Sequence, residues 1–152
     1  MNSKRKSVIL FLIFLINSTQ LRLNTIESNF CQSMARIMIA DDSDAIRMVL
    51  KDILDIGHHE LVAEATNGLE AIEKFNETKP DLLILDMAMP KMDGIHALKE
   101  ILATNSNAKI VMVTASDNVN TMTECINAGA IAYLLKPFNF EDVLTSINMA
   151  LS

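Results

Sequence analysis

The chain contains 152 residues, of which 50% are hydrophobic and 21% are charged. This composition is typical of one globular domain with a buried core, and it excludes a disordered chain. The formal net charge of −6 argues against non-specific binding to nucleic acid. Two cysteines, Cys31 and Cys125, provide no disulfide framework and indicate free thiols in a reducing cytoplasm.

The N-terminal segment differs in character from the rest of the chain. Residues 1–33 contain four basic residues and one acidic residue, whereas residues 34–152 contain nine basic and eighteen acidic residues. A basic stretch, Lys4-Arg5-Lys6, precedes nine apolar residues, Val8 to Ile16. This is the outline of a signal peptide, but nine residues are too few to span a bilayer, which needs about 20.

We therefore divide the chain into an N-terminal extension, residues 1–34, and one domain, residues 35–152. The favoured interpretation is that Met34 is the true initiator and that the preceding residues come from an over-long gene prediction. A membrane-associating extension and a secretory signal are the alternatives. N-terminal sequencing of the native protein distinguishes the three.

From Met34 onward, short β-branched and apolar runs alternate with segments whose apolar residues recur at helical spacing. We expect strands at residues 36–40, 60–65, 81–86, 109–114 and 131–135. We expect the first helix to lie between Ser43, which can cap it, and Gly57, which ends it. We expect the other four helices at residues 69–78, 94–104, 118–127 and 140–151.

Each predicted helix has apolar residues three and four positions apart, and these mark the side that packs on the sheet. The helix at 118–127 has the weakest such stripe, so we expect it to be the easiest to move. The positions predicted to face the core are Ile46, Val49, Leu50, Ile53, Leu54, Leu69, Ile72, Phe75, Ile95, Leu98, Ile101, Leu102, Val119, Met122, Ile126, Phe140, Val143, Leu144, Ile147 and Leu151.

Five strands that alternate with five helices predict an α/β fold with a single doubly wound parallel sheet and helices on both faces. Right-handed crossovers leave few arrangements, and the flavodoxin-like strand order 2-1-3-4-5 is the commonest with five strands. The chain stops about one turn after this core is complete, so we expect no output domain to follow.

Polar side chains stand where four of these strands end. Asp41 and Asp42 follow the strand at 36–40, Asp86 ends the buried run Leu82-Leu83-Ile84-Leu85, Thr114 ends the fourth strand and Lys136 follows the fifth. In the expected strand order these ends are neighbours, and ligands bind at the carboxyl edge of such sheets.

Three neighbouring carboxylates repel one another, and a hard divalent cation such as Mg²⁺ removes that cost. A metal-held aspartate can attack phosphorus and form an aspartyl-phosphate. Mg²⁺, the Lys136 ammonium and the Thr114 hydroxyl could each neutralise or bind one phosphoryl oxygen. The sequence therefore predicts a Mg²⁺-dependent phosphoryl site.

Each of these residues taken alone has an ordinary structural explanation. An acidic pair can complement a helix dipole, a strand-end aspartate can belong to a turn, and a lysine before a proline is commonly a solvated loop residue. Asp93, directly before Gly94, is predicted to be a helix cap rather than a ligand. The functional prediction depends on their joint placement at one edge of the sheet.

Between about Ala35 and Leu151 the chain resembles the CheY-like receiver domains of response regulators. The resemblance rests on Asp41-Asp42, on Asp86 in Asp-x-x-Met-Pro-x-Met-Asp-Gly, on Thr114-Ala115 and on Tyr133-x-x-Lys136-Pro137. It implies that Asp86 is the phosphoacceptor. It also implies that Asp42 binds Mg²⁺ directly and Asp41 mainly through water, with the Ala88 main-chain carbonyl as a further ligand.

The resemblance further implies that Thr114 and Tyr133 form a switch pair, that Lys136 contacts the phosphate, and that the peptide bond before Pro137 is cis. Ala88 and Ser116 occupy positions at which the family tunes the lifetime of its aspartyl-phosphate. The implied function is that of a stand-alone, cytoplasmic response regulator of a two-component phosphorelay, in chemotaxis, motility or relay signalling, and not that of a turnover enzyme.

The implied partners are a histidine kinase and a target protein, which binds the face formed by residues 118–127, 131–135 and 140–151. No nucleic acid is expected, and no membrane unless residues 1–33 are retained. Three alternatives remain. The first is a flavodoxin that binds FMN, although Asp41-Asp42-Ser43-Asp44 would repel the FMN phosphate, and the second is a phosphatase with an aspartate nucleophile, although Met87 and Ala88 provide no general acid. The third is a degenerate receiver that binds proteins independently of phosphorylation.

Overall fold

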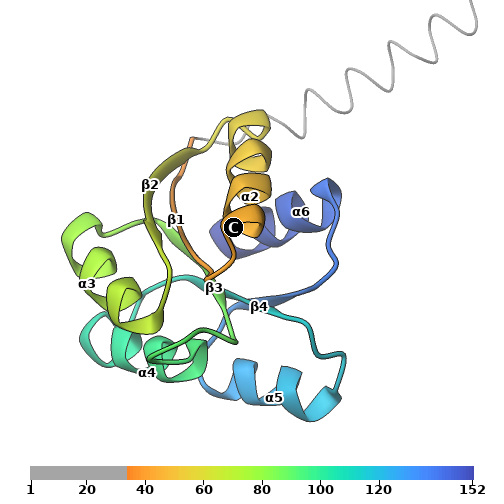
Figure 1. The fold of residues 1–152 in the computed structure, drawn as a ribbon. Coiled ribbons are helices and arrows are strands. Elements are labelled where there is room, and N and C mark those ends of the chain that lie inside the picture. Colours follow the sequence, from red (N-terminus) through yellow and green to blue (C-terminus); the bar gives the residue numbers. More distant parts are fainter. Residues whose placement is uncertain (1–33) are drawn as a thin grey trace, which may run out of the picture. The chain divides into compact units, whose positions relative to one another are not determined.

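The computed structural model describes residues 34–152, and the predictions for residues 1–33 lie outside the described residues. Ten elements follow one another in strict alternation of strand and helix (Figure 1). The strands are β1 (Arg36–Ala40), β2 (Glu60–Ala65), β3 (Leu82–Asp86), β4 (Ile110–Thr114) and β5 (Ala132–Leu135). The helices are α2 (Asp44–Ile56), α3 (Gly68–Thr78), α4 (Gly94–Thr104), α5 (Val119–Asn127) and α6 (Phe140–Leu151).

The strands form one parallel sheet in the order β2-β1-β3-β4-β5, which confirms the predicted doubly wound, flavodoxin-like fold. β3 and β4 are buried along their whole length, as continuous apolar runs in a parallel sheet predict. Helices α2 and α6 cover one face of the sheet, and α3, α4 and α5 cover the other (Figure 1).

Side-chain caps set the starts of the helices. The Ser43 side chain accepts a hydrogen bond from the Ile46 amide at the start of α2, and Asn67 does the same for α3. Asn139 and Asp142 form a reciprocal capping box at α6. Gly57 follows the last residue of α2, as predicted. Most predicted element boundaries agree with the structure to within one residue.

Four of the predicted inward positions are wrong. Val49, Leu69, Val119 and Ile126 are all exposed. Val49 lies at the margin of the stripe on α2, where Leu50, Ile53 and Leu54 fill the core, and Leu69 lies in the first turn of α3. In α5 the only fully buried residue is Cys125, which the apolar pattern did not single out.

No helix within residues 34–152 is both long enough and apolar enough to cross a membrane. Among the described residues, two buried apolar clusters are built on the same sheet, and they extend from Ala35 to Leu151. Residues 34–152 form one compact unit.

Candidate functional site at the carboxyl edge of the sheet

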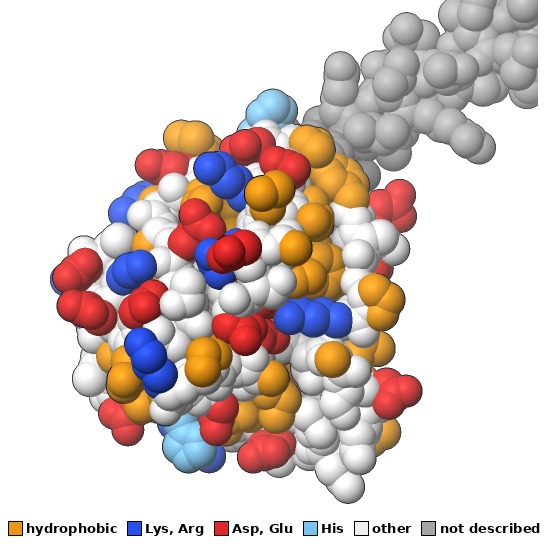
Figure 2. Space-filling view, in the orientation of Figure 1, with side chains coloured by type: hydrophobic (Ala, Val, Ile, Leu, Met, Phe, Trp, Pro, Cys, Tyr) orange, Lys and Arg blue, Asp and Glu red, His pale blue; other side chains and the backbone are white. Residues whose placement is uncertain are grey.

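The carboxyl ends of β1, β3, β4 and β5 meet because neighbouring strands are in register to their last residues. Ala40 pairs with Leu85, Asp86 with Val113, and Thr114 with Leu135. The side chains that follow these ends therefore gather at one edge. Figure 2 shows carboxylates meeting a basic side chain near the middle of this face.

Three carboxylates form the centre of the site. One oxygen each from Asp41, Asp42 and Asp86 lies within 4.8 Å of the other two. Asp41 and Asp86 are buried, whereas Asp42 is exposed. Hard oxygen donors at this spacing, open to solvent on one side, fit a Mg²⁺ ion that retains some of its waters.

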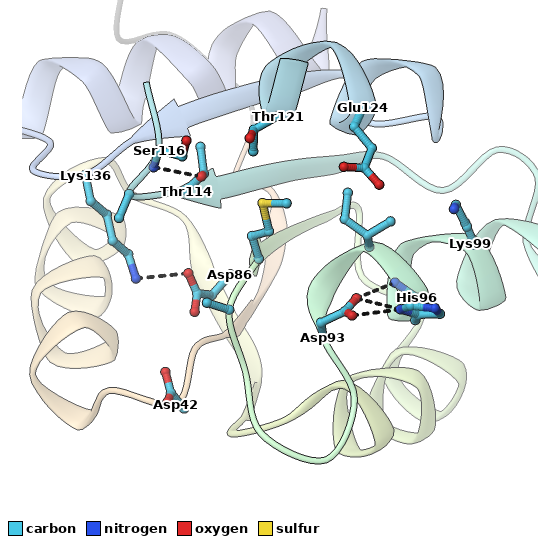
Figure 3. A pocket seen from close by; sticks show the side chains of 14 residues that line it. Asp42, Asp86, Asp93, His96, Lys99, Thr114, Ser116, Thr121, Glu124 and Lys136 are labelled. Carbon is cyan, nitrogen blue, oxygen red and sulfur yellow. Dashed lines mark hydrogen bonds and ion pairs between the residues drawn. The ribbon is translucent and has the colours of Figure 1, made fainter. Parts of the chain in front are cut away.

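Lys136 joins two of these carboxylates. Its Nζ donates to Asp41 Oδ2 at 2.8 Å and to Asp86 Oδ1 at 3.0 Å. The Lys136 side chain is 22% exposed, and those of its partners are 2% and 5% exposed. In Figure 3 the Lys136 ammonium points toward Asp86, and the Asp42 carboxylate lies near both. The sequence placed Lys136 in the site, but its contact with Asp41 was not predicted.

Burial dominates the electrostatics of Asp86. Desolvation raises the pKa of the Asp86 carboxyl, and repulsion from Asp41 and Asp42 adds to the effect, although the hydrogen bond from Lys136 opposes it. Burial alone would lower the pKa of Lys136, but the hydrogen bonds to Asp41 and Asp86 outweigh burial and raise it. The ammonium group is therefore retained beside a carboxylate whose ionised form is disfavoured by burial.

Both carboxylate oxygens of Asp41 already accept a hydrogen bond within the protein. Its Oδ1 accepts from the Ser43 amide at 2.8 Å, and its Oδ2 accepts from Lys136. Within residues 34–152, by contrast, no protein group is hydrogen-bonded to the Asp42 carboxylate. Asp42 and Asp86 are thus better placed to contact a cation directly, and Asp41 is better placed to act through water.

Thr114 is buried, and its Oγ1 accepts a hydrogen bond from the Ser116 amide at 3.1 Å. Tyr133 lies on β5 and is 41% exposed. It borders a separate groove between β5 and α6. The structure therefore places the hydroxyl of Thr114 in the site and Tyr133 at the surface. The Lys136–Pro137 peptide bond is cis, as the resemblance implies.

The loop between β3 and α4 forms one wall of the site. The Met87 amide donates to the Val113 carbonyl at 2.8 Å, and the Gly94 amide donates to the Met87 carbonyl at 2.9 Å. Gly94 is required here, because a Cβ atom at this position would collide with the main-chain carbonyl of Asp86. Asp93 caps α4 by accepting from the His96 amide at 2.9 Å, which confirms its predicted structural role.

A cavity of about 610 Å³ connects the carboxylates with the surface between α4 and α5. Ala88 lines it. The lining also includes Asp42, Asp86, Thr114, Ser116 and Lys136 (Figure 3). The cavity continues past His96, Lys99 and Glu124, which the sequence did not single out. Those three residues occupy ordinary polar positions of amphipathic helices, so no local signal distinguished them.

Comparison with known proteins identifies the family. Residues 37–148 match the model of the response regulator receiver domain, and the chain belongs to this family. The chain is 45% identical to the chemotaxis protein CheY of Bacillus subtilis over 77% of its own length and 98% of that protein. It is 43% identical to CheY of Thermotoga maritima, over 74% of this chain and 94% of that protein.

Solved structures agree with this assignment. CheY of Borrelia burgdorferi, crystallised in a complex with CheX, BeF₃ and Mg²⁺, superimposes with a TM-score of 0.75 at 28% identity, covering 77% of this chain and 89% of that chain. A CheY-like receiver protein from Methanospirillum hungatei gives a TM-score of 0.72 at 32% identity, covering 78% and 94% of the two chains. The predicted fold and family are both confirmed.

Proposed function

We propose that this protein is a phosphorylation-dependent response regulator that accepts a phosphoryl group on Asp86 from a histidine kinase. One observation carries the proposal: a buried aspartate, a lysine and an exposed aspartate lie close together in the lining of one cavity (Figure 3). This arrangement brings a nucleophile, a cation-binding carboxylate and a positive charge together at one place.

The chemistry follows from these groups. An Asp86 carboxylate oxygen attacks the phosphorus of a phosphorylated histidine, and an O–P bond forms as the N–P bond breaks. The leaving imidazole nitrogen takes a proton from solvent. Lys136, already 3.0 Å from Asp86 Oδ1, then donates to a phosphoryl oxygen. The protein thus assists its own phosphorylation and the later hydrolysis of its aspartyl-phosphate. It is not a turnover enzyme.

Asp42, Asp86 and the Ala88 main-chain carbonyl are the groups we assign to the cation. A bound Mg²⁺ would supply positive charge that offsets the repulsion among the carboxylates and neutralises phosphoryl oxygens. The spacing of the carboxylate oxygens supports this assignment. So does the presence of Mg²⁺ and BeF₃ in the complex of the Borrelia relative.

We assign the switch to Thr114 and Tyr133. On phosphorylation the Thr114 hydroxyl leaves the Ser116 amide, its present partner, and donates to a phosphoryl oxygen. Tyr133 then turns from the surface into the space that Thr114 vacates, which shifts the population between two conformations. The altered surface comprises α5, β5 and α6, where the target protein binds.

A role in chemotaxis or motility is supported by the names of the relatives that the chain matches over nearly their whole length. The relative crystallised with CheX shows that such a domain can associate with a separate protein. We therefore assign this chain a histidine kinase and a separate target protein as its partners, and we place it in the cytoplasm with its phosphodonor.

The test is phosphorylation by acetyl phosphate with Mg²⁺, followed by intact mass spectrometry. The unaltered protein is expected to gain one phosphoryl group, and Asp86→Asn is expected to gain none. Asp93→Asn is the matched control, because asparagine retains the helix cap at α4, and it is expected to be labelled normally. Labelling of Asp86→Asn would contradict the assignment of Asp86 as the acceptor. Absence of labelling of the unaltered protein would contradict the proposal and favour a degenerate receiver.

A further inference from the structure

Arg47, on the first turns of α2, contacts the main chain of the site but none of the carboxylates of Asp41, Asp42 and Asp86. Its Nη1 donates to the main-chain carbonyl of Asp41 at 2.8 Å. Its Nε donates to Glu64 Oε1 on β2 at 3.1 Å, and its Nη2 pairs with the Asp44 carboxylate. The Arg47 side chain is only 13% exposed, so the guanidinium is held between α2, β2 and the loop that leaves β1.

This contact lies next to Asp42, the one carboxylate of the site that has no hydrogen-bond partner among residues 34–152. The Asp41 amide donates to the Ala65 carbonyl at 3.1 Å, and the Asp41 carbonyl accepts from Arg47. Ser43, on the other side, caps α2. The backbone is therefore fixed on both sides of Asp42. Since no described residue bonds the Asp42 carboxylate itself, its direction depends on this fixed backbone.

We propose that Arg47 is a positioning residue for the cation site: by clamping the Asp41 carbonyl to β2 and α2, it aims the Asp42 carboxylate at Asp86. The inference rests on the proposed function in one respect, namely that the site binds Mg²⁺. Groups that orient metal ligands from outside typically contribute 10- to 100-fold to metal affinity. Because Arg47 acts through the backbone, we expect an effect near the lower limit.

The planar guanidinium explains why arginine suits this position. Three oxygens from separate elements are bonded by three different nitrogen atoms, which a lysine ammonium on a single flexible stem cannot reproduce with fixed geometry. The exposed ion pairs with Glu64 and Asp44 contribute little stability by themselves. Their role here is to hold the guanidinium in place for its hydrogen bond to the Asp41 carbonyl.

The chain offers a matched control at the opposite end of the sheet. Arg36 also uses its guanidinium to bind main-chain carbonyls, donating to Lys79 at 3.0 Å and to Thr78 at 2.9 Å. Arg36→Met removes the same kind of contact at the amino end of β1, away from the carboxylates. Arg47→Met and Arg36→Met therefore differ mainly in whether the lost contact borders the site.

The test is calorimetric titration of the full chain with MgCl₂, with circular dichroism to establish folding. Arg47→Met is expected to raise the Mg²⁺ dissociation constant about tenfold, Arg47→Lys is expected to raise it less, and Arg36→Met is expected to leave it within about twofold. Glu64→Gln loosens the guanidinium without removing it and is expected to weaken Mg²⁺ binding slightly. This variant, together with Arg47→Lys, replaces Arg47→Met in the test if Arg47→Met does not fold.

An unchanged dissociation constant in folded Arg47→Met, or in folded Glu64→Gln and Arg47→Lys together, would overturn the inference and leave the proposed function intact. An equal loss in Arg36→Met would also overturn it, because it would indicate a general effect of destabilisation. Failure of the unaltered protein to bind Mg²⁺, or normal binding by Asp42→Asn, would instead contradict the cation site of the proposed function.

Discussion

Asp86 is a carboxylate held in an environment that disfavours its charge. It is buried, and two further carboxylates lie beside it, with Lys136 as the compensating cation. Burial and repulsion outweigh the lysine, so the pKa of Asp86 is raised. A carboxylate in this environment is suited to bind a cation or to accept a phosphoryl group, because either one changes the charge on the carboxylate oxygens.

The raised pKa predicts how stability depends on pH when no cation is bound. Since the folded-state pKa of Asp86 lies above the unfolded value, the folded protein binds its proton more tightly. The resulting stabilisation is complete below the unfolded pKa, about 3.9, and is lost as pH rises through the folded pKa. Asp86→Asn should therefore be more stable than the unaltered protein at pH 7 in EDTA.

The gain should appear as a higher Tm of Asp86→Asn at pH 7, should shrink as pH falls through the raised folded-state pKa of Asp86, and should be absent below about pH 4. Thermal melts by circular dichroism across this pH range check the prediction. Asp93 is the control of opposite sign, because hydrogen bonds from His96 lower the pKa of that carboxyl. Asp93→Asn should lose stability at pH 7 and approach the unaltered protein in acid. An Asp86→Asn protein less stable at pH 7 would contradict the account.

At the scale of the elements, the five helices are not equally anchored. α4 buries Gly94, Ile95, Ala97, Leu98 and Ile101, whereas α5 buries Cys125 alone. Of the three apolar residues expected to anchor α5, Val119 and Ile126 are exposed and Met122 is half-buried. The sequence predicted that this helix is the most weakly attached, and the structure shows still fewer anchoring side chains than the pattern indicated.

Weak anchoring predicts faster opening of α5 than of α4. Because local opening free energies follow the buried contacts of a segment, amides of Val119–Asn127 should exchange with deuterium before those of Gly94–Thr104. Hydrogen exchange followed by mass spectrometry of peptides from the unphosphorylated protein measures this difference. Equal protection of the two helices would contradict the claim that burial sets their mobility, and it would remove one support for α5 as a moving part of the switch.

At the scale of the whole molecule, the parallel sheet assembles the site. Asp41 and Lys136 are 95 positions apart in the chain, yet their side chains lie within hydrogen-bonding distance. Every strand runs in the same direction, so the ends of β1, β3, β4 and β5 reach one edge together. Within the described residues 34–152, two apolar cores pack on the faces of this sheet and hold it in place.

We therefore predict that residues 34–152, expressed alone, fold cooperatively and bind Mg²⁺ with the affinity of the full chain. A single sharp thermal transition by circular dichroism and matching calorimetric titrations are the expected results. A broad transition would show that the described domain depends on the N-terminal segment. An altered Mg²⁺ affinity with a normal melt would show instead that the segment influences the site.

The sequence alone determined the order of the elements, the parallel sheet and the residues at its carboxyl edge, because strand and helix periodicities and strand-end positions are local properties of a chain. It also identified the cap at Asp93. It did not determine the exposure of Val49, Leu69, Val119 and Ile126. The apolar stripe of a helix does not show which of its residues neighbouring elements cover and which lie beyond that contact.

Only the tertiary structure revealed that Lys136 binds Asp41 as well as Asp86, and that Arg47 bonds the Asp41 carbonyl. Both contacts join residues on separate elements through long, flexible side chains. Their partners are set by the packing of helices on the sheet and not by spacing along the chain. The sequence therefore determined which chemical groups reach the edge of the sheet, and packing decided which of them are paired and which carboxylate is left open.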